Sequence, residues 1–219
     1  MVYDYRYAAA AERQRQMLAD AENYRRVRQG RPRRFRPGRR SARRTAGHDQ
    51  PAVLRDGSEV LIGPVGPADV PLLADGFARL SARSRQLRFL GPKKQLTPAE
   101  LRYLTEIDHH DHEALGAVDR ASGLSVGVAH YVRSFEDAQA AEIAVTVVDE
   151  WQRRGLGTEL LAQLAQRARE EGIRRFTALV GADNLAMTGL VRTTGAALIR
   201  REAATLVYEI PLDPWSGRS

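Results

Sequence analysis

The sequence contains no cysteine among its 219 residues. Disulfide bonds, thiolate nucleophiles and cysteine-ligated metal sites are therefore excluded, and a reducing compartment, the cytoplasm, is the expectation. Long hydrophobic runs are also missing. No window approaches the roughly 18 apolar residues that a membrane-spanning helix needs, and the start of the chain has no apolar stretch of signal-peptide length. We therefore expect a soluble protein with no membrane partner.

Acidic residues are missing from one stretch of the chain. Residues 25–44 hold eleven Arg and neither Lys nor acid, so residues 1–44 carry a net charge of +10 while residues 45–219 carry −3. A basic segment of this kind can bind nucleic acid by neutralising phosphates. Apart from Phe35, however, it lacks the interleaved aromatic side chains that stack on bases. We therefore favour a solvated linker over a nucleic-acid partner.

The chain does contain enough hydrophobic residues, 43% of the total, to bury one sizeable core. Residues 7–28 are rich in helix formers but have a thin apolar stripe, which predicts a marginal helix. The segment after them is rich in Gly, Pro and Arg, which predicts a disordered linker. We divide the chain into an N-terminal extension (1–50), a folded domain (51–213) and a C-terminal tail (214–219).

Strand and helix patterns alternate through the folded region. Thr97 and Glu100 form a capping box with Pro98 at the first helical position, which indicates a helix start. Strands are predicted at 58–65, 113–119, 124–132, 141–148, 175–180, 197–199 and 204–210. Apolar residues at helical spacing predict helices that begin near residues 66, 81, 97, 155 and 184. This order predicts an α/β (α+β) fold with a mixed central sheet of about six or seven strands and helices on both faces.

A glycine-rich turn joins the strand at residues 141–148 to the longest helix, in the segment VVDEWQRRGLGTELL. The first amides of a helix have no partner within it, and the helix dipole adds positive potential there, so this arrangement is an anion site. Gly155 and Gly157 would let a diphosphate approach the backbone. A P-loop is excluded because no Lys follows Gly157, and a dinucleotide fingerprint because position 160 is Leu160. A glycine-rich helix start without a ligand is the alternative.

The segment QRRGLG, between a strand and a helix, fits the signature Q/R-x-x-G-x-G/A and resembles the Gcn5-related N-acetyltransferase (GNAT) superfamily. NLAMTGLVRTTG resembles the second cofactor segment of that family. LSARSRQLRFLGPKKQLTPAELRYLTEID followed by AEIAVTVVDEWQRRGLG is similar to the acetyltransferase domain of bacterial Pat-type protein lysine acetyltransferases. The resemblance implies the GNAT fold and acetyl-CoA as cosubstrate, with no metal. The residues it implies for cofactor binding are Val147, Gln152, Arg153, Arg154, Gly155, Leu156, Gly157, Thr158, Asn184 and Met187.

The resemblance also implies how the chemistry proceeds. Pat-type enzymes have their catalytic glutamate at the position of Glu142, where it would take a proton from the acceptor amine, since lysine has a reference pKa near 10.4. The backbone amide of Val147 would bind the thioester carbonyl. The alternative for Glu142 is a strand-edge carboxylate that only faces solvent. Many relatives carry Tyr where this chain has Val191, so the group that protonates the leaving thiolate stays open between Tyr131 and water.

Five polar residues, 108–112 (DHHDH), precede the strand predicted at 113–119. Their spacing matches no metal-site signature. We interpret them as a polar loop that enters the strand. The alternative is a role in substrate recognition, because the corresponding Pat-type segment borders the acceptor lysine site.

Taken together, these features predict an N-acetyltransferase that transfers acetyl directly to a protein lysine. The resemblance suggests an acyl-CoA synthetase as the acceptor protein. Two alternatives stay open: a small amine as the acceptor, or a nucleic-acid-associated protein that only senses acetyl-CoA. The presence of Glu142 argues against the sensor, since a sensor needs no base.

Overall fold

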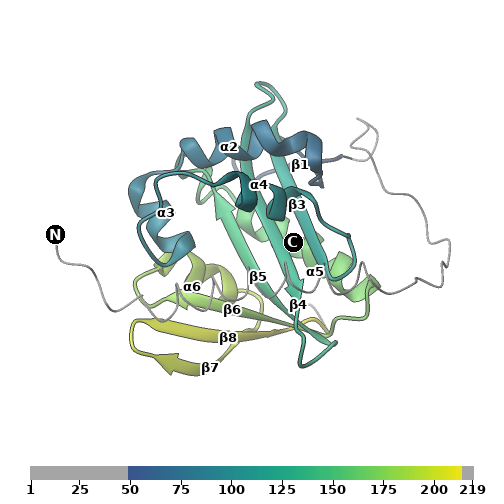
Figure 1. Cartoon of the computed structure of the whole chain (residues 1–219), viewed down its shortest axis with the longest axis vertical. Coiled ribbons are helices and arrows are strands. Elements are labelled where there is room, and N and C mark those ends of the chain that lie inside the picture. Colours follow the sequence, from purple (N-terminus) through teal and green to yellow (C-terminus); the bar gives the residue numbers. More distant parts are fainter. Residues whose placement is uncertain (1–48, 214–219) are drawn as a thin grey trace.

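The computed structural model describes residues 49–213, so the predicted N-terminal helix and linker and the C-terminal tail lie outside the described residues. Eight strands form one mixed sheet in the order β1-β2-β3-β4-β5-β6-β8-β7 (Figure 1). The strands are β1 Gln50–Val53, β2 Glu59–Pro64, β3 His112–Asp119, β4 Ser125–Arg133, β5 Ala140–Val147, β6 Arg175–Gly181, β7 Ala197–Glu202 and β8 Thr205–Pro211. The helices are α2 Val70–Ala78, α3 Ala82–Phe89, α4 Pro98–Thr105, α5 Leu156–Glu170 and α6 Leu185–Arg192, with short 3-10 helices η2 Pro67–Asp69 and η3 Asp149–Trp151.

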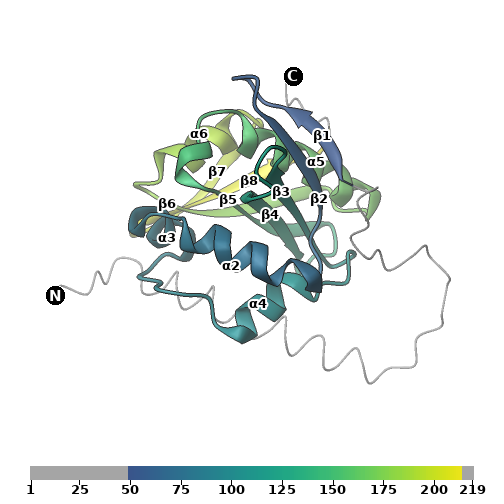
Figure 2. The ribbon, with the colours of Figure 1, turned by 90° about the horizontal axis from the view of Figure 1, so that it is seen from above.

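The predicted mixed sheet with helices on both faces is confirmed. Helices α2 and α4 lie on one side of the sheet and α5 on the other (Figure 2). One stripe of α5 is buried against β3, β4 and β5, and it consists of Leu156, Leu160, Leu161, Leu164, Ala165 and Ala168. The i, i+4 spacing within this stripe is the pattern that predicted the helix. Full burial of each Leu stabilises the fold by roughly 1.5–3 kcal/mol, so α5 holds the centre of the sheet.

The sheet has one strand more than the six or seven predicted. The additional strand, β1, pairs antiparallel with β2 from Gln50↔Ile62 to Val53↔Glu59 and forms an edge of the sheet. It begins inside the segment predicted to be an extension. Its four residues are mostly exposed and include Pro51, which is tolerated on an edge strand because no ladder hydrogen bond is lost there. A short, exposed strand that contains proline has no alternating apolar pattern, so the sequence does not predict it.

Helices α3 and α4 begin at well-formed N-caps. In α4, Thr97 Oγ1 accepts a hydrogen bond from the Glu100 amide (3.2 Å), and the Glu100 carboxylate accepts one from the Thr97 amide (2.8 Å), as the capping box predicted. In α3, Ser81 Oγ accepts a hydrogen bond from the Ser84 amide (3.1 Å). A cap of this kind stabilises a helix by about 1 kcal/mol.

The central strands β5 and β6 run parallel but stay paired over a short length. Their ladder extends from Ala140↔Arg175 to Glu142↔Thr177, whereas β5 pairs with β4 as far as Val147. Beyond Glu142 the two strands diverge (Figure 1). The divergence leaves a gap in the sheet beside the carboxyl-terminal half of β5, close to the start of α5.

Candidate functional site

The gap between β5 and β6 exposes backbone donors. The Val148 amide donates to the Val126 carbonyl and the Ser134 amide donates to the Ala140 carbonyl, so the even-numbered residues of β5 bond to β4. The amides of odd-numbered residues therefore point toward β6. For Val147 that side has no ladder partner within the described chain, because pairing with β6 ends at Glu142. The Val147 amide therefore points into the gap.

The turn into α5 presents its backbone to one side of this gap. Arg153 (φ 63°) and Gly155 (φ 95°) both adopt left-handed backbone conformations, and Gly155 is the N-cap. No side chain in residues 49–213 caps the helix, and the first bond within it runs from the Glu159 amide to the Gly155 carbonyl (3.1 Å). The amides of Leu156, Gly157 and Thr158 are thus left for an anion, as expected for a helix start of this kind.

A wall of apolar side chains faces Gly157. A Cβ built on this glycine would lie 3.4 Å from Leu190 Cδ2, 3.9 Å from Val147 Cγ2 and 4.0 Å from Val145 Cγ1. An alanine would fit these contacts, but a larger side chain would have to occupy the gap itself. The backbone of this turn therefore forms a cradle, the space beside Gly157, which a bulky side chain at position 157 would fill.

Two predicted cofactor residues use their side chains within the protein. Gln152 Nε2 donates to the Val147 carbonyl (3.1 Å) and to Ser84 Oγ (3.3 Å), which ties the turn to β5 and α3. Arg154 Nη1 lies 3.2 Å from Asp56 Oδ2, so this guanidinium is held by the β1–β2 turn. The side chains of Gln152 and Arg154 therefore fix the shape of the turn. Any contact of these two residues with a ligand would be made by their backbone.

Helix α6 forms the opposite wall of the gap. Asn184 is its N-cap, and Asn184 Oδ1 accepts a hydrogen bond from the Met187 amide (3.0 Å). Met187 and Leu190 pack, half-buried, against the main core together with Val145 and Val147. The second predicted cofactor segment and the glycine turn are thus brought to the same gap from parts of the chain about 30 residues apart.

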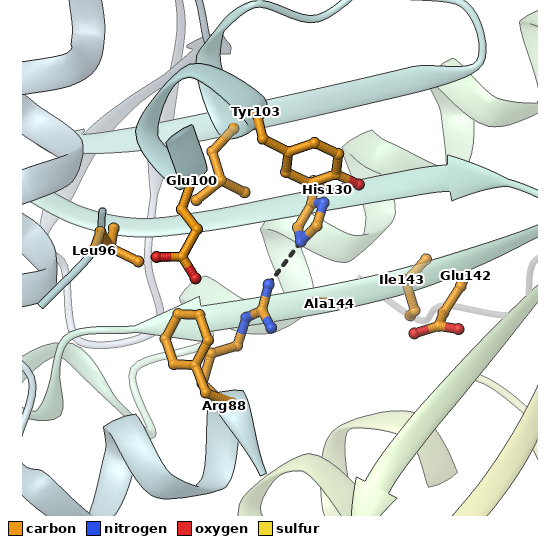
Figure 3. A pocket seen from close by; sticks show the side chains of 10 residues that line it. Arg88, Leu96, Glu100, Tyr103, His130, Glu142, Ile143 and Ala144 are labelled. Atoms are coloured by element: carbon orange, nitrogen blue, oxygen red, sulfur yellow. Dashed lines mark hydrogen bonds between the residues drawn. The ribbon is translucent and has the colours of Figure 1, made fainter. Parts of the chain in front are cut away.

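Glu142 lines a pocket on the face of the sheet that carries α3 and α4 (Figure 3). Glu142 is half-buried and is the last residue of β5 that pairs with β6, so its carboxylate lies where the gap begins. The residues that line the pocket are Arg88, Phe89, Leu96, Glu100, Tyr103, Leu104, His130, Glu142, Ile143 and Ala144. Glu142 therefore faces a pocket beside the gap.

A hydrogen bond between Arg88 and His130 crosses the middle of this pocket (Figure 3). Arg88 Nη2 lies 2.7 Å from His130 Nε2. Because a guanidinium can only donate, Nε2 must accept, and the proton of a neutral imidazole then resides on Nδ1. Burial holds the pKa of His130 well below its usual value, and the positive charges of Arg88 and His112 lower it further. His130 is therefore neutral at physiological pH.

The sequence does not predict that α3 holds together the glycine turn and the start of α6. The hydroxyl groups of Ser81 and Ser84 donate to Asp149 Oδ1 (2.7 and 2.8 Å), just before the glycine turn. Arg83 Nη2 pairs with Asp183 Oδ2 (2.8 Å), just before α6. A signal was present, since residues 76–99 contain six bases and no acid, and those charges need partners elsewhere.

Tyr131 is wrongly placed to protonate a leaving thiolate. It pairs with Ile143, so its side chain lies on the α5 face of the sheet, opposite Glu142. Its hydroxyl donates to the His110 carbonyl (3.1 Å), and burial raises its pKa. Val191, at the position of the tyrosine of many relatives, is fully buried. Of the two candidates for protonating the thiolate, water is left.

The polar residues 108–112 form a self-supporting loop. Asp108 Oδ1 accepts hydrogen bonds from the amides of His110 (3.1 Å), Asp111 (2.9 Å) and His112 (2.9 Å). Burial raises the pKa of Asp108, but these bonds outweigh burial and lower it. The ring of His112 lies near the pocket, 5.5 Å from that of His130. The interpretation as a polar loop fits these contacts, and His112 is its link to the site.

Two further classes of feature are not seen in residues 49–213. No group of three or more His, Cys, Asp or Glu side chains there is arranged to hold a metal ion. Among the helices of this same range, none combines the length and the apolar character that spanning a bilayer requires.

Comparisons with known proteins agree with this geometry. Residues 82–196 match the model of the acetyltransferase (GNAT) family. The acetyltransferase Pat of Mycolicibacterium smegmatis is 34% identical over 164 residues, which cover 75% of this chain and 49% of Pat. An acetyltransferase of Pseudomonas aeruginosa is 35% identical over 144 residues, which cover 65% of this chain and 77% of that protein. This chain thus spans about half the length of Pat.

A solved structure gives the same result. The GNAT domain of PAT from S. lividans matches with a TM-score of 0.71 and 29% identity, covering 74% of this chain and 96% of that domain. From its sequence, its sheet with a gap between β5 and β6, and these likenesses, the chain belongs to the GNAT acetyltransferase family.

Proposed function

We propose that this chain transfers an acetyl group from acetyl-CoA to the side-chain amine of a protein lysine, with Glu142 as the general base. The observation that carries the proposal is the position of Glu142. Its carboxylate lines a pocket on one face of the sheet and also marks the point where β5 and β6 separate. An amine in the pocket and a thioester in the gap would therefore meet beside it.

The residues at the gap fit acetyl-CoA, which supplies an activated acetyl thioester. The uncapped amides of Leu156, Gly157 and Thr158 suit a diphosphate, whose charge is also favoured by the helix dipole. The Val147 amide suits a carbonyl oxygen of the extended arm or of the thioester. Members of the family use acetyl-CoA as the acetyl donor.

Glu142 is the group in the pocket best suited to accept the proton of the amine. His130 is a poor base because its pKa is held well below the usual value and Arg88 already occupies Nε2. Arg88 can only donate. Glu100 is engaged by its own helix cap at Thr97. A carboxylate at Glu142 can accept a proton directly or through one water, which is how a lysine becomes a nucleophile at neutral pH.

The lining and the charge of the pocket suit a lysine side chain. Its apolar lining, which includes Phe89, Leu96 and Leu104, suits the methylene stem, while Glu100 and Glu142 attract the ammonium group. The resemblance of the sequence to Pat-type protein lysine acetyltransferases supports a protein as the acceptor, and it points to an acyl-CoA synthetase.

Isotope-labelled acetyl-CoA incubated with a cell lysate tests this acceptor class. We expect label on the Nε of a few lysines in wild-type reactions and a large loss of that label with the Glu142→Gln variant. Label recovered only in small amines, with none on protein, would replace the protein acceptor by a small amine. The fold would be unchanged in that case, because fold alone does not set the acceptor.

A chain that begins at Asp49 is expected to keep its turnover. Every residue of the gap and pocket lies beyond this point, and so does β1, which a start at Pro51 would disrupt. The measurement is kcat on a lysine peptide for the shortened and the full chain, with thermal unfolding to confirm folding. A large fall in kcat without loss of folding would show that residues 1–48 take part in catalysis.

A further inference from the structure

The chain uses lysine at only two of its 34 basic positions, Lys93 and Lys94. All the others are arginine, including the eleven bases of residues 25–44. Both lysines lie in the connection between α3 and α4, and Lys93 contacts Glu100 and Phe89, which line the pocket that contains Glu142. One of the two primary side-chain amines of this protein therefore lies beside the proposed acceptor site.

The ammonium of Lys93 rests against the wall of that pocket. Lys93 Nζ forms an ion pair with Glu100 Oε1 and lies 5.8 Å from the centroid of the Phe89 ring. Glu100 and Phe89 both line the pocket. The side chains of Lys93 and Glu100 are each 22% exposed. Burial raises the pKa of Glu100, but its bonds to Lys93 and Thr97 outweigh burial and lower it.

The geometry points to Lys93 as an acetylation site of the active site that it borders. We propose this on the basis of the function proposed above. Glu100 and Glu142 line the same pocket, so the ammonium has to leave Glu100 and pass the hydrogen bond between Arg88 and His130 to reach Glu142. The four-carbon stem of lysine is flexible, and the connection from Gly91 to Leu96 contains neither helix nor strand. Together these two features would let Nζ reach Glu142.

The proposed step is balanced without a further reactant. Glu142 takes one proton from the Lys93 ammonium, and the neutral Nζ attacks the thioester carbonyl of acetyl-CoA. The new C–N bond forms as the C–S bond breaks, and the second proton goes to the departing thiolate. One ammonium and one acetyl-CoA give one N-acetyl-lysine, one CoA thiol and one proton, which Glu142 releases to solvent. Neighbouring arginines such as Arg85 and Arg88 cannot react in this way because they do not deprotonate.

Acetylation would also change the charge of the pocket. An acetylated Lys93 has no positive charge, so Glu100 loses its ion-pair partner. Glu100 and Glu142 then face the pocket as two carboxylates, balanced by Arg88 alone among the lining residues. A pocket that has become more negative binds a protonated acceptor more tightly. Self-acetylation should therefore lower KM for an external lysine.

The experiment uses the full chain, acetyl-CoA and peptide mapping by mass spectrometry. We expect one acetyl group per chain, located on Lys93. Lys93→Arg should lose this acetyl group, while the matched variant Lys94→Arg should keep it. Glu142→Gln should slow the modification as strongly as it slows transfer to a lysine peptide. The rate per molecule should not change when the protein is diluted, because the site is in the same chain.

The contrary results are distinct. Equal labelling of Lys93 and Lys94, or labelling that persists in Glu142→Gln, would show uncatalysed chemical acetylation and overturn the proposal. A rate that falls in proportion to dilution would overturn transfer within one chain. An external lysine peptide in the same reaction separates the two proposals: a labelled peptide with an unlabelled Lys93 refutes self-acetylation alone, whereas no label on either refutes the proposed function.

Kinetics of the purified acetylated and unmodified forms test the effect on the pocket. We expect a lower KM for the lysine peptide in the acetylated form, with little change in kcat. Lys93→Arg, which keeps the charge and cannot be acetylated, should show the KM of the unmodified form before and after incubation with acetyl-CoA. Equal KM values for the two forms would overturn the proposed effect on acceptor binding.

Discussion

Replacing Glu142 by Gln is expected to lower kcat for acetylation of a lysine peptide by about 10²–10⁴-fold, the usual effect of losing a general base. The amide has the size of the carboxylate but cannot accept the proton of the acceptor. Affinity for acetyl-CoA should stay close to wild type, because the donors proposed for it are backbone amides of β5 and α5. The comparison is made at saturating acetyl-CoA, with calorimetry to measure binding.

The pH dependence adds a second readout to this variant. Without the carboxylate, the acceptor has to lose its proton to solvent, so the activity of Glu142→Gln should recover in part as pH rises toward the pKa of lysine, near 10.4. Glu136→Gln is the matched control, since Glu136 is exposed in the loop that precedes β5 and lies outside the pocket. Near-wild-type turnover of Glu142→Gln at pH 7 would show that this carboxylate is not the base.

Gly157→Trp is expected to weaken acetyl-CoA binding by about a hundredfold or more. Two charge-assisted hydrogen bonds to the diphosphate, each contributing about 1.5–3 kcal/mol, would be lost if the indole filled the cradle. The space beside Gly157 admits little more than a methyl group, since Leu190 Cδ2 lies 3.4 Å from the Cβ position. Gly157→Ala should therefore bind far better than Gly157→Trp. Calorimetric titration with acetyl-CoA measures the affinities.

The control for this variant is Gly66→Trp. Gly66 precedes η2, away from the gap, and nothing lies within 4 Å of its Cβ position. Thermal unfolding of both variants shows whether the fold is kept. A folded Gly157→Trp protein that binds acetyl-CoA with unchanged affinity would remove the cofactor site from the start of α5.

Much of the fold could be predicted because the determining signals are local. The capping box at Thr97 and Glu100, the apolar stripe of α5 and the glycine turn each lie within a short stretch of chain, and each element begins within a residue or two of its predicted start. The placement of Glu142 beside the turn also follows from one strand, since ten residues separate it from Gln152. Local pattern and local structure agree here.

The rest of the site depends on contacts between distant segments. The hydrogen bond from Arg88 to His130 spans 42 residues, and that from Ser84 to Asp149 spans 65. No periodic pattern in the sequence could therefore predict either bond. Tyr131 is a candidate proton donor by residue type. Its side chain lies on the opposite face, which the register of β4 with β5 determines.

The most direct test of the central claim follows the acetyl group from donor to acceptor in one reaction. The purified chain is incubated with acetyl-CoA and a lysine peptide, and the CoA thiol released and the acetyl-lysine formed are measured together. We predict equal amounts of the two products, formed at a rate that depends on Glu142. Acetyl-CoA that binds without giving acetyl-lysine, or CoA released without it, would contradict direct transfer to a lysine amine.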